Sequence, residues 1–309
     1  SLALDSAANQ KQVAELLVGL LRTSGDRGRE KTARAISRFS NAHMSNQNAM
    51  AAAGGIDFVV SLIAPRKAEK QRKGFMMKLA AAKDDPDGAK DGEAEDEDSA
   101  NAVGEHHLIQ KELASALWKM SSNNQTNQTR VANCGAIPLL ISLIDDHDDI
   151  HRDAAGALWS LAADTENQQL IADAGGIPAL VGLLQSGKKN LAQETAAGAL
   201  HSLALRAENR DLIADAGEVG GITQMVPLLE TGTEMAKEEV SGALLTLVID
   251  NPPNQFLILT KLVAMIHAGP ADASDIAAGG EAMRMRVEAQ EHATNVIYQT
   301  SCPHNFAVS

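Results

Sequence analysis

Three segments of the chain are copies of one another. Residues 153–184 and 194–217 share the runs Ala-Ala-Gly-Ala-Leu and Leu-Ile-Ala-Asp-Ala-Gly, and residues 112–140 are a weaker third copy. The apolar residues recur with a helical period, and the copies lie about 40 residues apart. One repeat of this kind cannot bury its apolar face alone, so stacked neighbours share a continuous core. The sequence therefore predicts an all-α fold, a right-handed α-solenoid of about six units with three helices in each full unit.

Two sets of equivalent positions, here called columns, align the repeats with one another. Each column includes one step about twice as long as the usual repeat, from Ala35 to Ala116 in the first and from Val60 to Ile141 in the second. One repeat length near the N-terminus has therefore been replaced by other sequence. The first column holds Ala35, Ala116, Ala157, Ala199, Ala243 and, more loosely, Asn295, and the second holds Val18, Val60, Ile141, Val181, Val226 and Val263.

Residues 66–104 fill this long step with charged sequence. The first half, to Lys78, is basic, and the stretch from Asp84 to Asp98 is rich in carboxylates. Such a segment buries too little apolar surface to offset the entropy lost on ordering, so we expect a disordered insert. Its opposite charges either pair with each other, or the acidic half covers a basic groove. The chain then divides into N-terminal repeats (1–65, the first truncated), the insert (66–104), well-formed repeats (105–250) and a divergent C-terminal repeat (251–309).

The unit around residue 175 shows how each repeat makes its helices. Asn167 begins a short helix that Gly175-Gly176 ends, because glycine adopts the left-handed conformation without steric cost. Pro178 lies in the first turn of the second helix, where its missing N–H group is harmless. The third and longest helix is predicted from Asn190 to about Leu205.

A glycine recurs inside the third helix of three units, at Gly156, Gly198 and Gly242. Each glycine costs about 1 kcal/mol of helix stability relative to alanine. A cost repeated at one position indicates either that a neighbouring side chain needs the space or that the copies simply inherited the residue. The sequence leaves both interpretations open.

These runs resemble armadillo repeats. The resemblance rests on Ala-Gly-Gly-Ile-Pro-x-Leu-Val-x-Leu-Leu at 174–184 and Glu-x-Ala-x-x-Ala-Leu-x-x-Leu-Ala at 194–204. It covers residues 13–64 and 105–247 well and the last 60 residues poorly. The resemblance is to vacuolar-type and β-catenin-like scaffolds, and it implies a concave groove, lined by the third helices, that binds a partner protein.

Nuclear-import receptors of this family carry a Trp in the third helix and, four residues later, an Asn that holds the backbone of a bound peptide. Neither the series of Trp residues nor the series of Asn residues is present here. The hydroxyl groups found at several Asn positions cannot supply the paired donor and acceptor of a carboxamide. The resemblance therefore implies a partner other than a nuclear-localisation peptide. The Trp positions correspond to Arg34, Ser115, Gly156, Gly198, Gly242 and Thr294, and the Asn positions to Arg38, Lys119, Ser160, Ser202, Thr246 and Tyr298.

Another column of the third helix contains both tryptophans of the chain. It holds Trp118, Trp159, His201, Leu245 and Ile297, each directly before an Asn position. Tryptophan is enriched at binding hot spots because a rigid ring buries a large area at low entropic cost. The alternative is that each ring fills the space beside a neighbouring glycine. In either case Lys119, Ser160 and Ser202 flank the column on the groove side. The candidate partner-binding residues are Trp118, Lys119, Trp159, Ser160, His201 and Ser202.

The sequence contains no pattern that predicts catalysis or a cofactor. It lacks a phosphate-binding glycine loop and a nucleophile motif, and the net charge of −13 argues against a nucleic-acid partner. His147 and His151 could face one metal ion across a helical turn, but acidic residues are expected at this helix N-terminus in any case. We therefore expect no enzymatic activity, no cofactor and no metal ion.

The cysteine content and the hydropathy bear on location. Cys134 and Cys302 lie too far apart in sequence to suggest a disulfide framework, so a reducing compartment is expected. No apolar run reaches the roughly 18–20 residues of a membrane span, and no signal peptide is visible. Because the chain begins at Ser1 without Met, we expect a fragment of a longer solenoid. The predicted location is cytoplasmic, with nuclear or membrane-associated locations as alternatives.

The predicted function is a non-enzymatic scaffold that binds a protein or peptide segment along the concave groove. Two alternatives remain open. One is an adaptor tethered to a membrane by an N-terminal lipid that this chain would lack. The other is the substrate-binding repeat region of a larger ubiquitin ligase or kinase. The full-length reading frame would distinguish these three.

Overall fold

A computed structural model describes residues 6–64, 96–146, 150–185, 190–267, 294 and 296–298 of the chain. The described residues form α-helices and turns, without a β-strand among them. The chain divides into two compact units, Ser1–Leu139 and Leu140–Ser309, and each unit is described by itself. The predicted all-α fold is confirmed.

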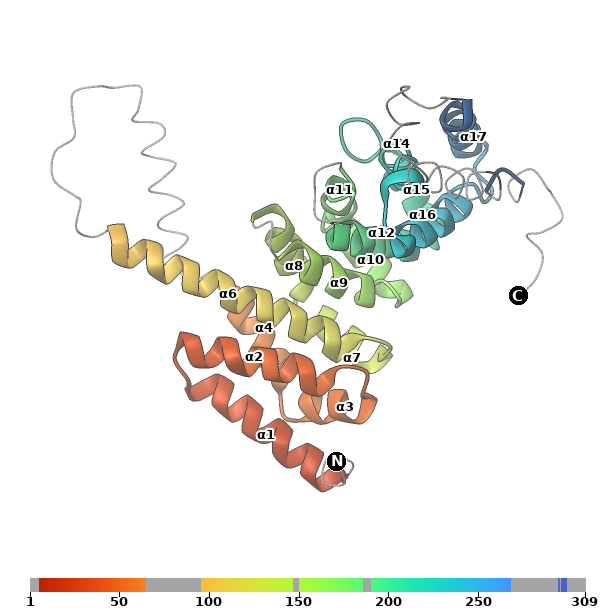
Figure 1. Ribbon diagram of the computed structural model, residues 1–309. Helices are drawn as coiled ribbons and strands as arrows, with labels where there is room; N and C mark the ends of the chain where they lie inside the picture. Colours follow the sequence, from red (N-terminus) through yellow and green to blue (C-terminus); the bar gives the residue numbers. More distant parts are fainter. Residues whose placement is uncertain are drawn as a thin grey trace, which may run out of the picture. The chain divides into compact units, whose positions relative to one another are not determined.

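The first unit consists of helices packed in the order expected for stacked repeats (Figure 1). The two long helices α2 and α6 lie side by side as third helices of successive repeats, and α3 and α4 connect them. Their apolar faces meet in a core that includes Ile36, Ile56, Leu113 and Leu117, all fully buried. The helices are α1 (Ala7–Thr23), α2 (Asp26–Ser40), α3 (Met44–Ala52), α4 (Gly55–Ile63), α6 (Asp96–Ser121) and α7 (Gln125–Asn133), and α8 (Ala136–Asp146) crosses into the second unit.

In the second unit the third helices α9, α12 and α16 pack in sequence order. The second helix of the repeat that ends with α16 is divided into α14 and α15, because Pro227 falls within it and cannot donate a backbone hydrogen bond. The helices are α9 (His151–Leu161), α10 (Thr165–Asp173), α11 (Gly176–Gly182), α12 (Asn190–Ala204), α13 (Ala207–Asp215), α14 (Gly221–Met225), α15 (Leu228–Thr231), α16 (Glu234–Leu247) and α17 (Pro252–His267).

The junction between first and second helices has the predicted glycine geometry. Gly54 and Gly175 have φ angles of 76° and 81°, in the left-handed region, and each caps the N-terminus of the next helix. The helix predicted from Asn190 to about Leu205 is α12, and it ends at Ala204. These local predictions are confirmed.

A buried asparagine at the start of each first helix ties that helix to the end of the preceding third helix. The side-chain amide of Asn127 donates to the carbonyl of Met120 at 2.8 Å, and that of Asn209 donates to Leu203 at 3.1 Å. Carbonyl groups at a helix C-terminus lack partners within the helix, so the amide satisfies an acceptor that would otherwise be buried alone. The same bond is made by Asn46 to Phe39, Asn167 to Leu161 and Asn254 to Leu247.

The predicted insert lies partly outside the described residues. Helix α6 begins at Asp96, within the range 66–104 assigned to the insert from sequence. Residues 65–95 are not among those described, so their disorder stays a prediction. The boundaries proposed for the C-terminal repeat also stay predictions, because only α17 and a few residues near 297 are described beyond residue 250.

Candidate functional site

The six candidate residues lie on third helices and are all half-buried. Trp118 and Lys119 belong to α6 in the first unit. The remaining four belong to α9 and α12, which are neighbours in the second unit. They are Trp159, Ser160, His201 and Ser202, and none of the six is either fully buried or largely exposed.

The ring of Trp159 on α9 rests on Gly198 of α12. A Cβ atom added at residue 198 would lie 2.6 Å from Cζ2 of the indole, too close for any real side chain. The next repeat makes the same contact, because a Cβ atom at Gly242 of α16 would lie 2.8 Å from Nε2 of His201. At these two positions a neighbouring side chain needs the space, and that interpretation of the glycines is confirmed. We call this arrangement the ring-on-glycine contact.

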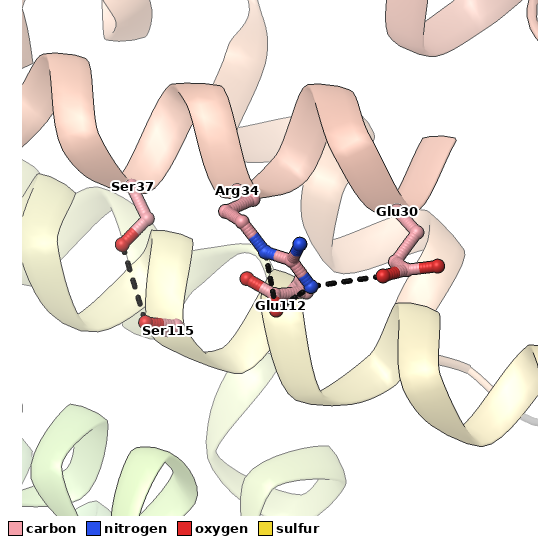
Figure 2. Close-up of polar contacts among 5 residues, drawn as sticks. All are labelled: Glu30, Arg34, Ser37, Glu112 and Ser115. Atoms are coloured by element: carbon pink, nitrogen blue, oxygen red, sulfur yellow. Dashed lines mark hydrogen bonds and ion pairs between the residues drawn. The ribbon is translucent and has the colours of Figure 1, made fainter. Parts of the chain in front are cut away.

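The first unit has serines at the two positions that make this contact. Ser37 of α2 occupies the ring column and Ser115 of α6 the glycine column, and their hydroxyl oxygens are 3.2 Å apart (Figure 2). A short side chain in the ring column leaves room for a Cβ atom and a hydroxyl opposite it. The sizes of the two residues are therefore matched between successive third helices.

Trp118 has a cationic neighbour on its own helix. The ammonium group of Lys119 lies 3.7 Å from the centroid of the indole ring, which is a close cation–π distance. The backbone carbonyl of Lys119 also accepts a hydrogen bond from Gln47 of α3 at 2.9 Å. These contacts hold the two residues in place on α6.

Two hydroxyl groups at the Asn positions bond within their own helices. Ser202 donates to the carbonyl of Gly198 at 3.0 Å, and Thr246 donates to that of Gly242 at 2.8 Å. The oxygen of Ser160 is screened from solvent and has no hydrogen-bond partner in the described part of the chain. A hydroxyl that has donated its only hydrogen cannot also donate to a peptide carbonyl, which supports the expectation that this chain does not hold peptides by an amide ladder.

Two carboxylates of the second unit, on α12 and α16, make hydrogen bonds between neighbouring third helices or their caps. Oε2 of Glu239 on α16 lies 2.9 Å from Nδ1 of His201, and it orients the imidazole above Gly242. Oε1 of Glu194 on α12 accepts a hydrogen bond from Thr233 at 2.6 Å. The surface beside His201 therefore includes a carboxylate.

A charged cluster holds the third helices of the first unit together (Figure 2). Nε and Nη2 of Arg34 lie 2.9 and 2.8 Å from Oε1 of Glu112, and Nη2 lies 2.9 Å from Oε1 of Glu30. The hydrogen bonds and charge of Glu112, followed by those of Glu30, raise the pKa of Arg34 above its usual value. Arg34 stands at a position where import receptors have Trp, and here it is used to pair with the neighbouring helix.

No group of three or more potential metal ligands occurs in the part of the chain that is described. His151 is buried at the start of α9, while His147 lies outside the described residues. Among the described helices none combines the length and apolar character needed to cross a bilayer.

Stacked units of two short helices and one long helix define the chain as an α-solenoid repeat protein. The repeats are of the armadillo type: residues 124–163 and 164–205 each match the model of the armadillo/beta-catenin-like repeat. Residues 124–205 therefore contain two armadillo repeats, as their junction sequences indicated.

Relatives of known sequence and structure agree with this assignment. Human "Splicing regulator ARVCF" is 35% identical over 89 residues, which cover 28% of this chain and 9% of that protein. The match thus spans less than a tenth of the curated relative. An engineered protein of known crystal structure has a TM-score of 0.63 at 21% identity, covering 92% of this chain and 97% of its own. A designed armadillo repeat protein in complex with the peptide (KR)4 has a TM-score of 0.59 at 18% identity, with 90% and 98% covered.

Proposed function

We propose that this chain is a non-enzymatic scaffold that binds a segment of a partner protein along its third helices. The observation that carries the proposal is the pair of ring-on-glycine contacts at Trp159 and His201. Armadillo-repeat folds commonly mediate protein or peptide binding, and one designed neighbour was solved with a peptide. The proposed surface in the second unit consists of Trp159, Ser160, His201 and Ser202.

The ring-on-glycine contact is a suitable basis for binding. One face of each ring is packed against a helix, and the half-burial of both residues leaves the rest open to a partner. A ring that is already held in place loses little conformational entropy on binding, so more of the contact energy remains as affinity. The rings contribute to packing as well, so the two interpretations of the column are compatible.

The test uses a peptide selected from a random displayed library against the whole chain. Trp118→Phe leaves Trp159 as the only tryptophan, so its emission reports directly on this surface. We expect a selected peptide to shift that emission saturably. Trp159→Ala should weaken binding at least about 30-fold, or roughly 2 kcal/mol, as a hot-spot residue does. The affinity is measured by fluorescence anisotropy of the labelled peptide.

The matched control is Leu170→Ala on α10, since Leu170 is 46% exposed but lies on a first helix. This variant should bind the peptide as the unchanged chain does. Circular dichroism of both variants separates loss of affinity from loss of fold. Equal affinities of Trp159→Ala and the unchanged chain, or failure of the library to yield any binding peptide, would contradict the proposal.

The cytoplasm remains the proposed location. Cys134 is a free thiol that donates a hydrogen bond to Asp57 at 3.3 Å, and a free thiol is typical of proteins in reducing compartments. The location of the tagged full-length protein would test this.

A further inference from the structure

A hollow of about 350 Å³ opens between successive first helices of the second unit. The first of the two repeats contributes Ala172, Ile177 and Pro178, and the next contributes Asp211, Leu212 and Asp215 on α13. Leu212 is 53% exposed, so its side chain is accessible to a ligand in the hollow. The hollow lies between first helices, so it is separate from the surface of the third helices proposed above.

In the first unit an ion pair joins the equivalent positions. The runs Gly55-Ile56-Asp57 and Gly176-Ile177-Pro178 are in register, which places Asp57 at the position of Pro178. Arg130 and Leu212 each lie three residues after the buried asparagine of their first helix, Asn127 and Asn209. They therefore occupy equivalent positions. Nη2 of Arg130 lies 2.6 Å from Oδ2 of Asp57, so an arginine side chain spans this space in the first unit.

The second unit lacks that arginine but offers two carboxylates. Asp211 and Asp215 are four residues apart and therefore lie on the same face of α13, and both are exposed. Oδ1 of Asp211 accepts a hydrogen bond from Asn251 at 2.6 Å, which fixes its position. Two like charges at this spacing repel each other, so a cation placed between them relieves an unfavourable interaction. The charge of the hollow is thus complementary to a basic group.

We propose that this hollow binds a partner segment in which an apolar side chain is followed by an arginine. The apolar side chain packs on Leu212, Pro178 and Ile177. The guanidinium donates hydrogen bonds to the carboxylates of Asp211 and Asp215, an arrangement suited to its planar fork of donors. The volume is at the lower end of the range for ligand pockets, which matches one or two side chains rather than a whole folded surface.

The probe for this site is the capped dipeptide acetyl-leucyl-arginine amide, added to the whole chain with labelled methyl groups. We expect saturable NMR shifts at the methyl groups of Ile177 and Leu212. Acetyl-leucyl-citrulline amide has nearly the same shape without the charge, and it should bind about tenfold more weakly because it loses the charge-assisted bonds. Asp215→Asn should reduce the preference for the arginine probe over the citrulline probe while leaving the circular dichroism spectrum unchanged.

The first unit supplies a matched variant that closes the hollow. Pro178→Asp with Leu212→Arg reproduces the Asp57–Arg130 ion pair at the equivalent positions, and it should abolish the shifts at Ile177. Trp159→Ala should leave the binding unchanged, so the two proposals fail or succeed separately.

Three results would overturn this proposal. They are equal binding of the arginine and citrulline probes, shifts that persist when the ion pair closes the hollow, and no saturation in the low-millimolar range. NMR shifts that change with protein concentration in the absence of the probe would identify a second copy of the chain as the occupant of the hollow. That result would also contradict the proposal.

Discussion

At the scale of single residues, the third helices are matched by side-chain size. Trp159 and His201 each oppose a glycine, whereas Ser37 opposes Ser115. A glycine inside a helix costs about 1 kcal/mol, and the ring that rests on it recovers stability by burying aromatic area against the neighbouring backbone. The recurring glycine is therefore explained by the next repeat rather than by its own helix.

We predict that Gly198→Ala and Trp159→Ala are strongly coupled. Alone, Gly198→Ala gains about 1 kcal/mol of helix propensity but loses about 1–3 kcal/mol through the clash with the indole, so the chain should be destabilised. In the Trp159→Ala background the clash is absent, and the same change should be neutral or stabilising by up to about 1 kcal/mol. Urea unfolding of the four chains measures the coupling. Additive effects would show that the ring moves away without cost.

At the scale of helices, polar contacts link each repeat to the next. Gln47 of α3 donates to the carbonyl of Lys119 at the end of α6, and Arg210 of α13 donates to Ile249 beyond α16 at 2.8 Å. In the first unit, Asp57 of α4 joins Arg130 of α7 and Cys134 directly after that helix. Burial, followed by the hydrogen bond and charge of Asp57, raises the pKa of the Cys134 thiol. Burial acts to raise the pKa of Asp57, but the hydrogen bonds from Cys134 and Arg130 outweigh it, and the pKa is lowered.

This arrangement predicts that Asp57→Asn makes Cys134 more reactive. Without the carboxylate, the thiol pKa should fall towards its ordinary value, and alkylation by iodoacetamide should begin at lower pH. The measurement is the pH–rate profile in a Cys302→Ser background, with Lys11→Ala on α1 as a distant control. A profile that stays in place, or moves to higher pH, would contradict the assigned role of Asp57.

The same pKa shift has a consequence for stability. Because the folded pKa of Cys134 is raised, its contribution is fully present below the pKa of the unfolded thiol, near 9.0, and is lost as pH rises through the higher folded value. Asp57 has the opposite sign: its contribution is present above the ordinary carboxyl pKa and is lost as pH falls through the lowered value. Its side chain is 53% exposed, so solvent screening keeps the effect of the ion pair below about 1 kcal/mol.

At the scale of the whole molecule, a solenoid is stabilised by contacts between neighbouring repeats. A segment that makes few such contacts can be replaced at little cost. We predict that a Gly/Ser linker of equal length in place of residues 66–95, with α6 kept whole from Asp96, leaves the melting temperature nearly unchanged. Thermal unfolding followed by circular dichroism measures this. A fall of more than about 5 °C would mean that the segment packs as a repeat.

Most of the helical framework was predictable from sequence because it depends on short-range patterns. Apolar spacing, Gly175 at the junction and Pro178 in the first turn act within a few residues of themselves, so they predict helix ends in any context. The candidate column was also found this way, since a repeat period places Trp159 and His201 at equivalent positions. Whether those rings were covered could not be predicted, because the covering atoms belong to another repeat.

The tertiary structure decided which residues meet across repeats. Asp57 and Arg130 are 73 positions apart, and nothing in their local sequence indicates a pair. The recurring asparagine was visible as a pattern, but its role depends on the carbonyl of the preceding third helix, as with Asn209 and Leu203. The open hollow beside Leu212 depends on α13 of one repeat and on α10, α11 and the turn between them in the preceding repeat. A sequence alone determines local conformation through neighbouring residues, whereas contacts between distant residues exist only after the repeats stack and exclude water.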